Sequence, residues 1–101
     1  LYLSPVLAAR AGSTHGYDVV DPGHASPALG GDAGFDALAD AVRAHGMGLV
    51  LDVVPNHMGV GDANPYWDDV LAVGRESPYA RWFDVAWEHL ARIGRRQLVL
   101  P

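Results

Sequence analysis

Two short apolar runs and one amphipathic stretch between them organise the first half of the chain. Residues 1–5 and residues 49–54 are rich in strand-forming side chains, and each run leads into a proline. Between them, Phe35, Leu38 and Val42 fall at the i, i+3, i+7 spacing of one buried helix face. This order predicts a strand, a helix and a second strand, parallel to the first and joined to it by a right-handed crossover.

Polar and glycine residues mark the limits of the predicted helix. Asp32 is a candidate N-cap, His45 falls at the last turn, and Gly46 suits the position just after the helix. The stretch before it, residues 9–34, is rich in Gly, Pro, Ser, Asp and His. We expect a long, ordered loop there.

The second half of the chain has a second loop and a second helix. Residues 59–65 are rich in glycine, and Asn64 as N-cap with Pro65 at the first helical position predicts a helix that ends at Gly74. Residues 77–82 begin with a Ser-Pro cap and predict one more helical turn. Residues 83–87 are typical of a short extended segment.

Both ends of the chain consist of strand-like apolar residues, at 1–5 and 97–101. A free-standing domain rarely begins and ends inside such strands, because each would leave an unpaired edge. We therefore expect a fragment of a larger protein. The alternative is a small two-layer domain with edge strands at its termini.

Composition limits the classes of function. Half of the 101 residues are hydrophobic, so the chain can bury a modest core and is not disordered. The formal charge of −5 argues against a nucleic-acid or anionic-membrane partner. There is no cysteine, hence no disulfide. No signal peptide or long apolar span is visible, and we expect a cytoplasmic protein.

The run at residues 49–57 is the most informative for chemistry. Asp52 lies within apolar residues, where a carboxylate is costly unless it is hydrogen-bonded. Asn56 and His57 follow at the predicted carboxyl end of the strand, where α/β enzymes keep their active sites. The alternative is a core strand with a satisfied Asp and a loop His.

Several kinds of site are not supported. No two of the five histidines lie at i, i+4 on a predicted helix, and the spacing of a calcium loop is missing. There is no Gly-x-Ser-x-Gly elbow and no P-loop. We expect no metal site and no cofactor. Sugar binding is better supported, because six polar and aromatic side chains follow the predicted strands: His15, Tyr17, Asn56, His57, Tyr66 and Trp67. For Tyr66 and Trp67 the alternative is packing of a helix face.

The Asp-Val-Val-Pro-Asn-His of residues 52–57 resembles the first signature region of the α-amylase family, glycoside hydrolase family 13. The His-Gly-Tyr of residues 15–17 resembles the motif in the loop after the second barrel strand of that family. The finer resemblance is to its maltooligosyltrehalose synthase branch. It covers nearly all of the chain, is weakest at 88–96, and rests on residues 13–22, 29–31, 44–49, 55–60, 64–67 and 77–84.

The resemblance implies a fold. Residues 1–101 would be a fragment of a catalytic (β/α)8 TIM barrel, an α/β fold. The fragment would hold the end of strand 2, helix 2 and strand 3. Residues 58–101 would be part of an insertion after strand 3.

The resemblance also implies an activity: an intramolecular transglycosylase that converts the reducing-end α-1,4 bond of a maltooligosaccharide into an α,α-1,1 bond. Such retaining enzymes use one carboxylate as nucleophile and another as acid/base. In this family both follow later strands, so we expect no catalytic residue here. Five aspartates of this chain in particular should not be assigned those roles: Asp21, Asp52, Asp62, Asp68 and Asp69.

Binding residues are implied as well. Tyr17 would stack on the sugar at the cleavage site, and His57 would hydrogen-bond a hydroxyl of that sugar. His15 and Asn56 would also bind substrate, and Asp52 would support the strand end. Two alternatives stay open, namely an α-amylase-type glucan hydrolase and a non-catalytic carbohydrate-binding module.

Overall fold

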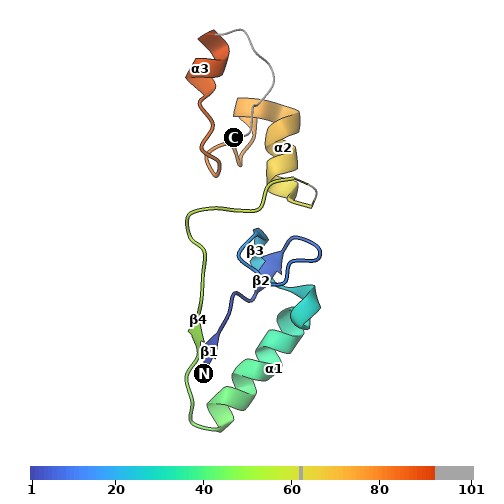
Figure 1. Cartoon of the computed structure of the whole chain (residues 1–101), viewed down its shortest axis with the longest axis vertical. Helices are drawn as coiled ribbons and strands as arrows, with labels where there is room; N and C mark the ends of the chain where they lie inside the picture. Colours follow the sequence, from blue (N-terminus) through green and yellow to red (C-terminus); the bar gives the residue numbers. More distant parts are fainter. Residues whose placement is uncertain (62, 93–101) are drawn as a thin grey trace. The chain divides into compact units, whose positions relative to one another are not determined.

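The computed structural model describes residues 1–61 and 63–92, and the chain forms two compact units, of which the first is Leu1–Asn64 and the second begins at Pro65. The strand expected at 97–101 lies outside the described residues, as does Asp62. Within the described part, no helix is long and apolar enough to span a membrane. In the first unit the elements are β1 (Tyr2–Leu3), β2 (Leu7–Ala9), β3 (Val19–Ala25), η1 (Pro27–Leu29), α1 (Gly31–Ala44) and β4 (Val50–Leu51) (Figure 1).

The predicted parallel pair of strands is confirmed. β1 and β4 run parallel, with Tyr2 opposite Val50 and Leu3 opposite Leu51, and they lie side by side in Figure 1. The predicted extent of the second strand, residues 49–54, is wrong, since β4 has only two residues. The ladder ends after the bond from Asp52 N to Leu3 O (3.1 Å), because β1 itself runs into Pro5, which has no N–H.

The helix between these strands is also confirmed, except at its beginning. Asp32 is not the N-cap: Gly30, at φ 101°, holds that position. Asp32 lies in the first turn, and its carboxylate accepts a hydrogen bond from Ala25 N at 2.7 Å. At the other end His45 is the C-cap and Gly46 follows at φ 67°, the left-handed conformation expected there.

The stretch predicted as a long loop contains a strand. β3 pairs antiparallel with β2, in a register that shifts twice. Val19 and Val20 at its start are buried, as is Val42 of α1. The prediction was wrong because Pro22 and Gly23 interrupt the strand pattern, and the irregular register accommodates both.

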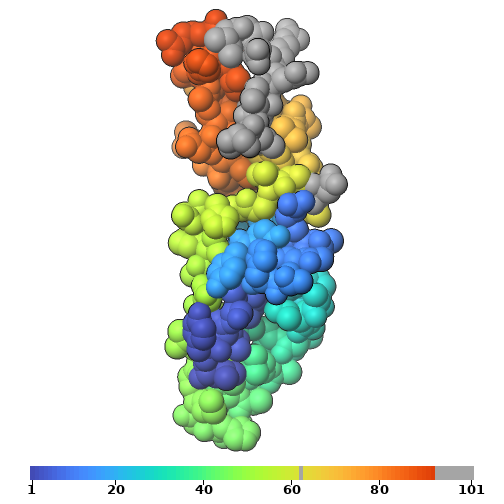
Figure 2. Space-filling view, in the orientation of Figure 1, coloured from blue at the N-terminus to red at the C-terminus, as the bar shows by residue number. Residues whose placement is uncertain are grey.

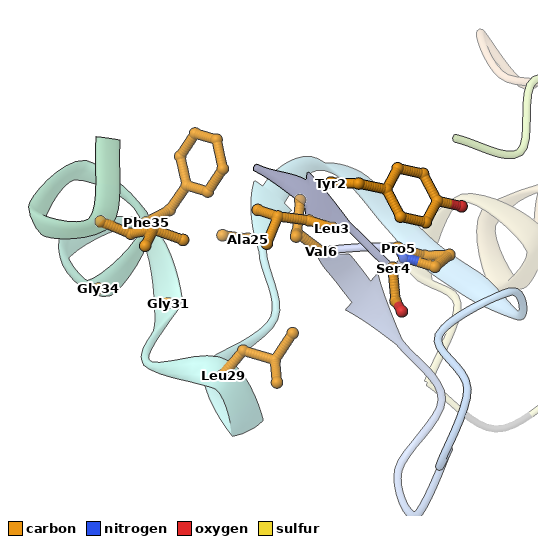
Figure 3. A pocket seen from close by; sticks show the side chains of 11 residues that line it. Tyr2, Leu3, Ser4, Pro5, Val6, Ala25, Leu29, Gly31, Gly34 and Phe35 are labelled. Atoms are coloured by element: carbon orange, nitrogen blue, oxygen red, sulfur yellow. The ribbon is translucent and has the colours of Figure 1, made fainter. Parts of the chain in front are cut away.

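An apolar hollow of about 440 Å³ lies between the first strands and α1. Leu3, Val6, Leu29 and Phe35 are among its lining residues (Figure 3). The Tyr2 ring points away from Phe35 in this view. The hydroxyl of Tyr2 therefore lies on the side away from α1.

The second unit holds α2 (Pro65–Val73), η2 (Gly74–Glu76) and α3 (Trp87–Arg92). The predicted helix start at Pro65 is confirmed. Residues 77–82 form turns rather than a helical turn, with Ala80 N bonded to Ser77 O. The segment 83–87 was predicted as extended, which is wrong at Trp87, the first residue of α3. Trp67 is buried and its ring lies 4.9 Å from that of Phe83.

Candidate sugar-binding site

The site is centred on the carboxylate of Asp52, just after β4. Its Oδ2 atom accepts hydrogen bonds from the hydroxyl of Tyr17 at 2.8 Å and from that of Tyr2 at 2.9 Å. Asp52 is half-buried rather than buried, but the expected hydrogen-bonding of this carboxylate is confirmed. In each case the hydrogen bond to Asp52, followed by its negative charge, raises the pKa of the tyrosine above 10.0.

His57 lies five residues further along and reaches the same tyrosine by its backbone. Its Nε2 atom lies 3.1 Å from the carbonyl oxygen of Tyr17, and its Nδ1 atom lies 3.1 Å from Oδ1 of Asn56. Three of the predicted site residues, Tyr17, Asn56 and His57, are thus brought together. All three are exposed at the surface.

His15 completes this group. Its ring is stacked against that of Tyr17, with centroids 5.8 Å apart and planes 23° apart. Its Nδ1 atom accepts a hydrogen bond from Tyr17 N at 3.0 Å. His15 therefore supports Tyr17 by both contacts. The sequence predicted only substrate binding for His15 and not this supporting role.

The loop that carries Tyr17 is held by polar contacts that the sequence did not reveal. The hydroxyl of Ser13 donates to Asp18 Oδ1 and accepts from Gly16 N, the latter at 3.1 Å. The bond from Ser13 lowers the pKa of Asp18 below 3.8. Gly16 has φ 78°, and a Cβ there would lie 3.0 Å from Pro5 O, so only glycine fits.

A second glycine joins the two halves of the site. Gly59 N donates to Val19 O at 2.7 Å, and a Cβ at Gly59 would lie 2.9 Å from Asp18 O. The segment after His57 therefore packs directly on the start of β3. In Figure 2 this segment, in yellow-green, adjoins the lighter-blue region of β3 on the visible face.

Among the described residues, no group of three or more His, Asp or Glu side chains is placed to hold a metal ion. The site instead offers an aromatic ring, imidazole nitrogens and amide groups. These are the groups that bind the ring faces and hydroxyls of a sugar.

Comparison with known proteins identifies the family. The α-amylase catalytic domain matches residues 1–97. The chain belongs to the α-amylase family. A Mycobacterium tuberculosis protein, provisionally named a maltooligosyl trehalose synthase, is 52% identical over 103 residues, an alignment that covers 100% of this chain and 13% of that protein. The intracellular maltogenic amylase of Bacillus subtilis is 36% identical over 85 residues, covering 84% of this chain and 14% of that protein.

Solved structures give the same result. The maltooligosyltrehalose synthase from Arthrobacter ramosus is 52% identical, with a TM-score of 0.81, over 87% of this chain and 12% of that one. The chain thus spans roughly an eighth of the length of its relatives. The α-amylase family recognised from residues 15–17 and 52–57 is confirmed, and so is the similarity to maltooligosyltrehalose synthases.

One residue of this candidate site was missed from the sequence. Tyr2 was considered only as part of an apolar strand, yet its hydroxyl contacts the same oxygen as Tyr17. No signal in the sequence alone could have found it, because the contact depends on the register of the two strands. Tyr2 lies opposite Val50, and Asp52 follows on the same face two residues later.

Proposed function

We propose that this chain is part of the (β/α)8 barrel of a maltooligosyltrehalose synthase and supplies one side of its sugar-binding cleft. In this proposal β1 is the end of barrel strand 2, α1 is helix 2, β4 is strand 3, and residues 58–101 belong to the insertion that follows. The substrate is a maltooligosaccharide or other α-1,4-glucan. A cytoplasmic location stays a prediction.

The observation that carries the proposal is the fixed position of Tyr17. Its hydroxyl is bonded to Asp52, its carbonyl oxygen to His57, and its ring is stacked on His15. A residue held at two side-chain points and one backbone point loses little conformational entropy when a sugar stacks on its ring. The residue still has 44% of its surface exposed, which leaves room for a ligand.

His57 would contribute a hydrogen bond to a hydroxyl of the same sugar. Its ring nitrogens already face Tyr17 O and Asn56, so a sugar hydroxyl would replace or share one of these partners. Exchange of one hydrogen bond for another costs little in the ground state. Geometry that improves only in the transition state would then raise the rate.

The chemistry would need carboxylates that this chain does not supply. A retaining mechanism requires a nucleophile and an acid/base about 5 Å apart. Asp52 is bonded to two tyrosines and belongs to the support of Tyr17. In this proposal the chain binds and orients the sugar, and the reacting carboxylates come from other strands.

The degree of similarity favours a synthase over a glucan hydrolase. Identity is 52% to the Arthrobacter ramosus synthase and 36% to the Bacillus subtilis maltogenic amylase. The two activities differ in the acceptor, which is a hydroxyl of the cleaved glucose in one and water in the other. The site residues described above would serve either reaction.

The test is a chimeric synthase, in which this chain replaces the aligned segment of the Arthrobacter ramosus enzyme. With maltohexaose, the proposal expects loss of reducing ends without change in chain length, since the product ends in a non-reducing α,α-1,1 bond. A gain of reducing ends would indicate a hydrolase segment. A folded chimera that leaves maltohexaose unchanged would contradict both and favour a non-catalytic module.

A further inference from the structure

Tyr2 is hydrogen-bonded to the site, but the proposed function assigns it no role. Its hydroxyl lies 2.9 Å from Oδ2 of Asp52, the oxygen that also accepts from Tyr17 at 2.8 Å. The two tyrosines are 15 positions apart in the sequence and come from different elements, β1 and the loop before β3. One carboxylate oxygen therefore links a strand to a loop.

The position of Tyr2 follows from strand pairing. β1 and β4 are joined by Val50 N to Leu1 O (2.9 Å) and Asp52 N to Leu3 O (3.1 Å). Tyr2 lies opposite Val50, and side chains two residues apart on a strand share a face. Tyr2 and Asp52 thus lie on one face of the pair, and their contact depends on backbone geometry rather than on a flexible loop.

Asp52 lies just after the end of β4 and its side chain is only half-buried, so strand pairing alone does not fix its side-chain orientation. With Tyr17 as its single partner, the carboxylate and the loop tyrosine could move together. A second donor on the same oxygen, from a residue whose backbone is paired in a strand, restricts that freedom although the Tyr2 side chain is itself exposed. Hydrogen bonds to an ionised carboxylate are also stronger than neutral ones. The backbone of β1 thus positions Tyr2, Tyr2 positions Asp52, and Asp52 positions Tyr17.

We propose that Tyr2 is a positioning residue, which acts through Asp52 to hold the Tyr17 ring in the orientation that accepts a sugar. This inference rests on the proposed function, in which Tyr17 stacks on the substrate. Tyr2 itself need not touch the sugar. Its contribution would be the pre-organisation of a ring that lies on a loop.

The test is the Tyr2→Phe variant of the chimeric synthase, which keeps the aromatic ring and removes only the hydroxyl. Stacking binds substrate and transition state alike, so its weakening raises KM and leaves kcat nearly unchanged. We expect KM for maltohexaose to rise roughly fivefold. A merely structural role would lower kcat through loss of folded enzyme and leave KM constant. KM does not depend on enzyme concentration, so it describes the molecules that are folded even if Tyr2→Phe is less stable.

A double-mutant cycle decides whether Tyr2 acts through Tyr17. Tyr17→Phe cannot bond to Asp52, so adding Tyr2→Phe to it should cause no further rise in KM. If Tyr2→Phe raises KM by the same factor in the parent and in the Tyr17→Phe variant, the inference is overturned. An unchanged KM in Tyr2→Phe alone would also overturn it. Tyr79→Phe, in the second unit, is the control for hydroxyl loss and should match the parent.

Failure of this inference can be distinguished from failure of the proposed function. If Tyr17→Ala weakens catalysis and Tyr2→Phe does not change KM, only the positioning role of Tyr2 is wrong. If Tyr17→Ala leaves the kinetics unchanged, the sugar-binding role of Tyr17 is wrong, and the inference is overturned with it.

Discussion

The Nε2 atom of His57 lies 3.1 Å from the carbonyl oxygen of Tyr17, which ties the segment after β4 to the loop before β3. A carbonyl oxygen only accepts, so Nε2 carries a proton. On the other side of the ring, Nδ1 lies 3.1 Å from Oδ1 of the neighbouring Asn56. These two contacts orient the His57 ring before any sugar binds.

Removal of this imidazole should affect catalysis more than stability. In the chimeric synthase, His57→Ala should lower kcat/KM for maltohexaose by about 10²-fold, because a hydrogen bond that tightens in the transition state is lost. The melting temperature should change little, since the His57 side chain is exposed. Steady-state kinetics and a melting curve test both statements.

The matched control for that variant is His45→Ala. His45 is an exposed histidine at the end of α1, and its ring bonds to a backbone oxygen, that of Ala41, at 2.8 Å. It should keep the kinetics of the parent. If His57→Ala also keeps them, or loses activity only because it unfolds, His57 is a structural residue.

Asp52 should behave as a support rather than as a reacting group. Asp52→Ala would leave the hydroxyls of Tyr2 and Tyr17 without their acceptor, so we expect a lower melting temperature and a higher KM. Asp52→Asn keeps one acceptor oxygen and should be affected less in both. Complete loss of kcat in a fully folded Asp52→Asn variant would instead assign this carboxylate to the reaction.

A pH-dependent contact lies within β3. Nδ1 of His24 lies 2.8 Å from Oδ2 of Asp21, and this hydrogen bond, then the charges of Asp21 and Asp32, raise the pKa of His24 above 6.5. Because the folded-state pKa is raised, the contribution of the pair to stability is complete below pH 6.5 and is lost as pH rises through the folded value.

The imidazole resonances of His24 measure this pKa directly. An NMR titration of the chimeric synthase should place the pKa above 6.5, and Asp21→Asn should move it down. Activity at a fixed pH should be the same in both proteins, since neither residue is placed in the sugar site. A pKa that does not respond to Asp21→Asn would show that the contact is absent in solution.

The chain by itself should be inactive and should not fold cooperatively. Among the described residues few apolar side chains are buried, and large apolar surfaces stay open in and just after β4, with Val50 61% and Val53 58% exposed. Two-stranded sheets of this kind are marginally stable alone. Calorimetry of the isolated chain should show no sharp transition, and maltohexaose should stay unchanged. A soluble monomer with a sharp two-state melt would favour the non-catalytic module.

The parts of the fold that were predictable from the sequence are those set by local periodicity. The spacing of Phe35, Leu38 and Val42 fixed one helix face, and a carboxylate at Asp52 within an apolar run required a hydrogen-bonding partner. β3 was not predictable because Pro22 and Gly23 conceal its pattern. The true start of α1 was not predictable either, because Asp32 and Gly30 both suit an N-cap and only tertiary structure gives Asp32 its other partner, Ala25.

The candidate site shows a similar division. Its motif residues Tyr17 and His57 were recognisable, because their types and order resemble those of the α-amylase family. Tyr2 was not, because its contact with Asp52 depends on the register of two strands that lie far apart in the sequence. Register is a property of the pairing and not of either strand alone.

The most direct test of the account is a crystal structure of the chimeric synthase, with the host's nucleophile replaced, bound to a maltooligosaccharide. We predict a glucose ring stacked on Tyr17, with one hydroxyl within hydrogen-bonding distance of a ring nitrogen of His57. Tyr17 should keep its bond to Asp52. A bound glucan that contacts neither Tyr17 nor His57 would contradict the central claim that this segment forms the sugar-binding face.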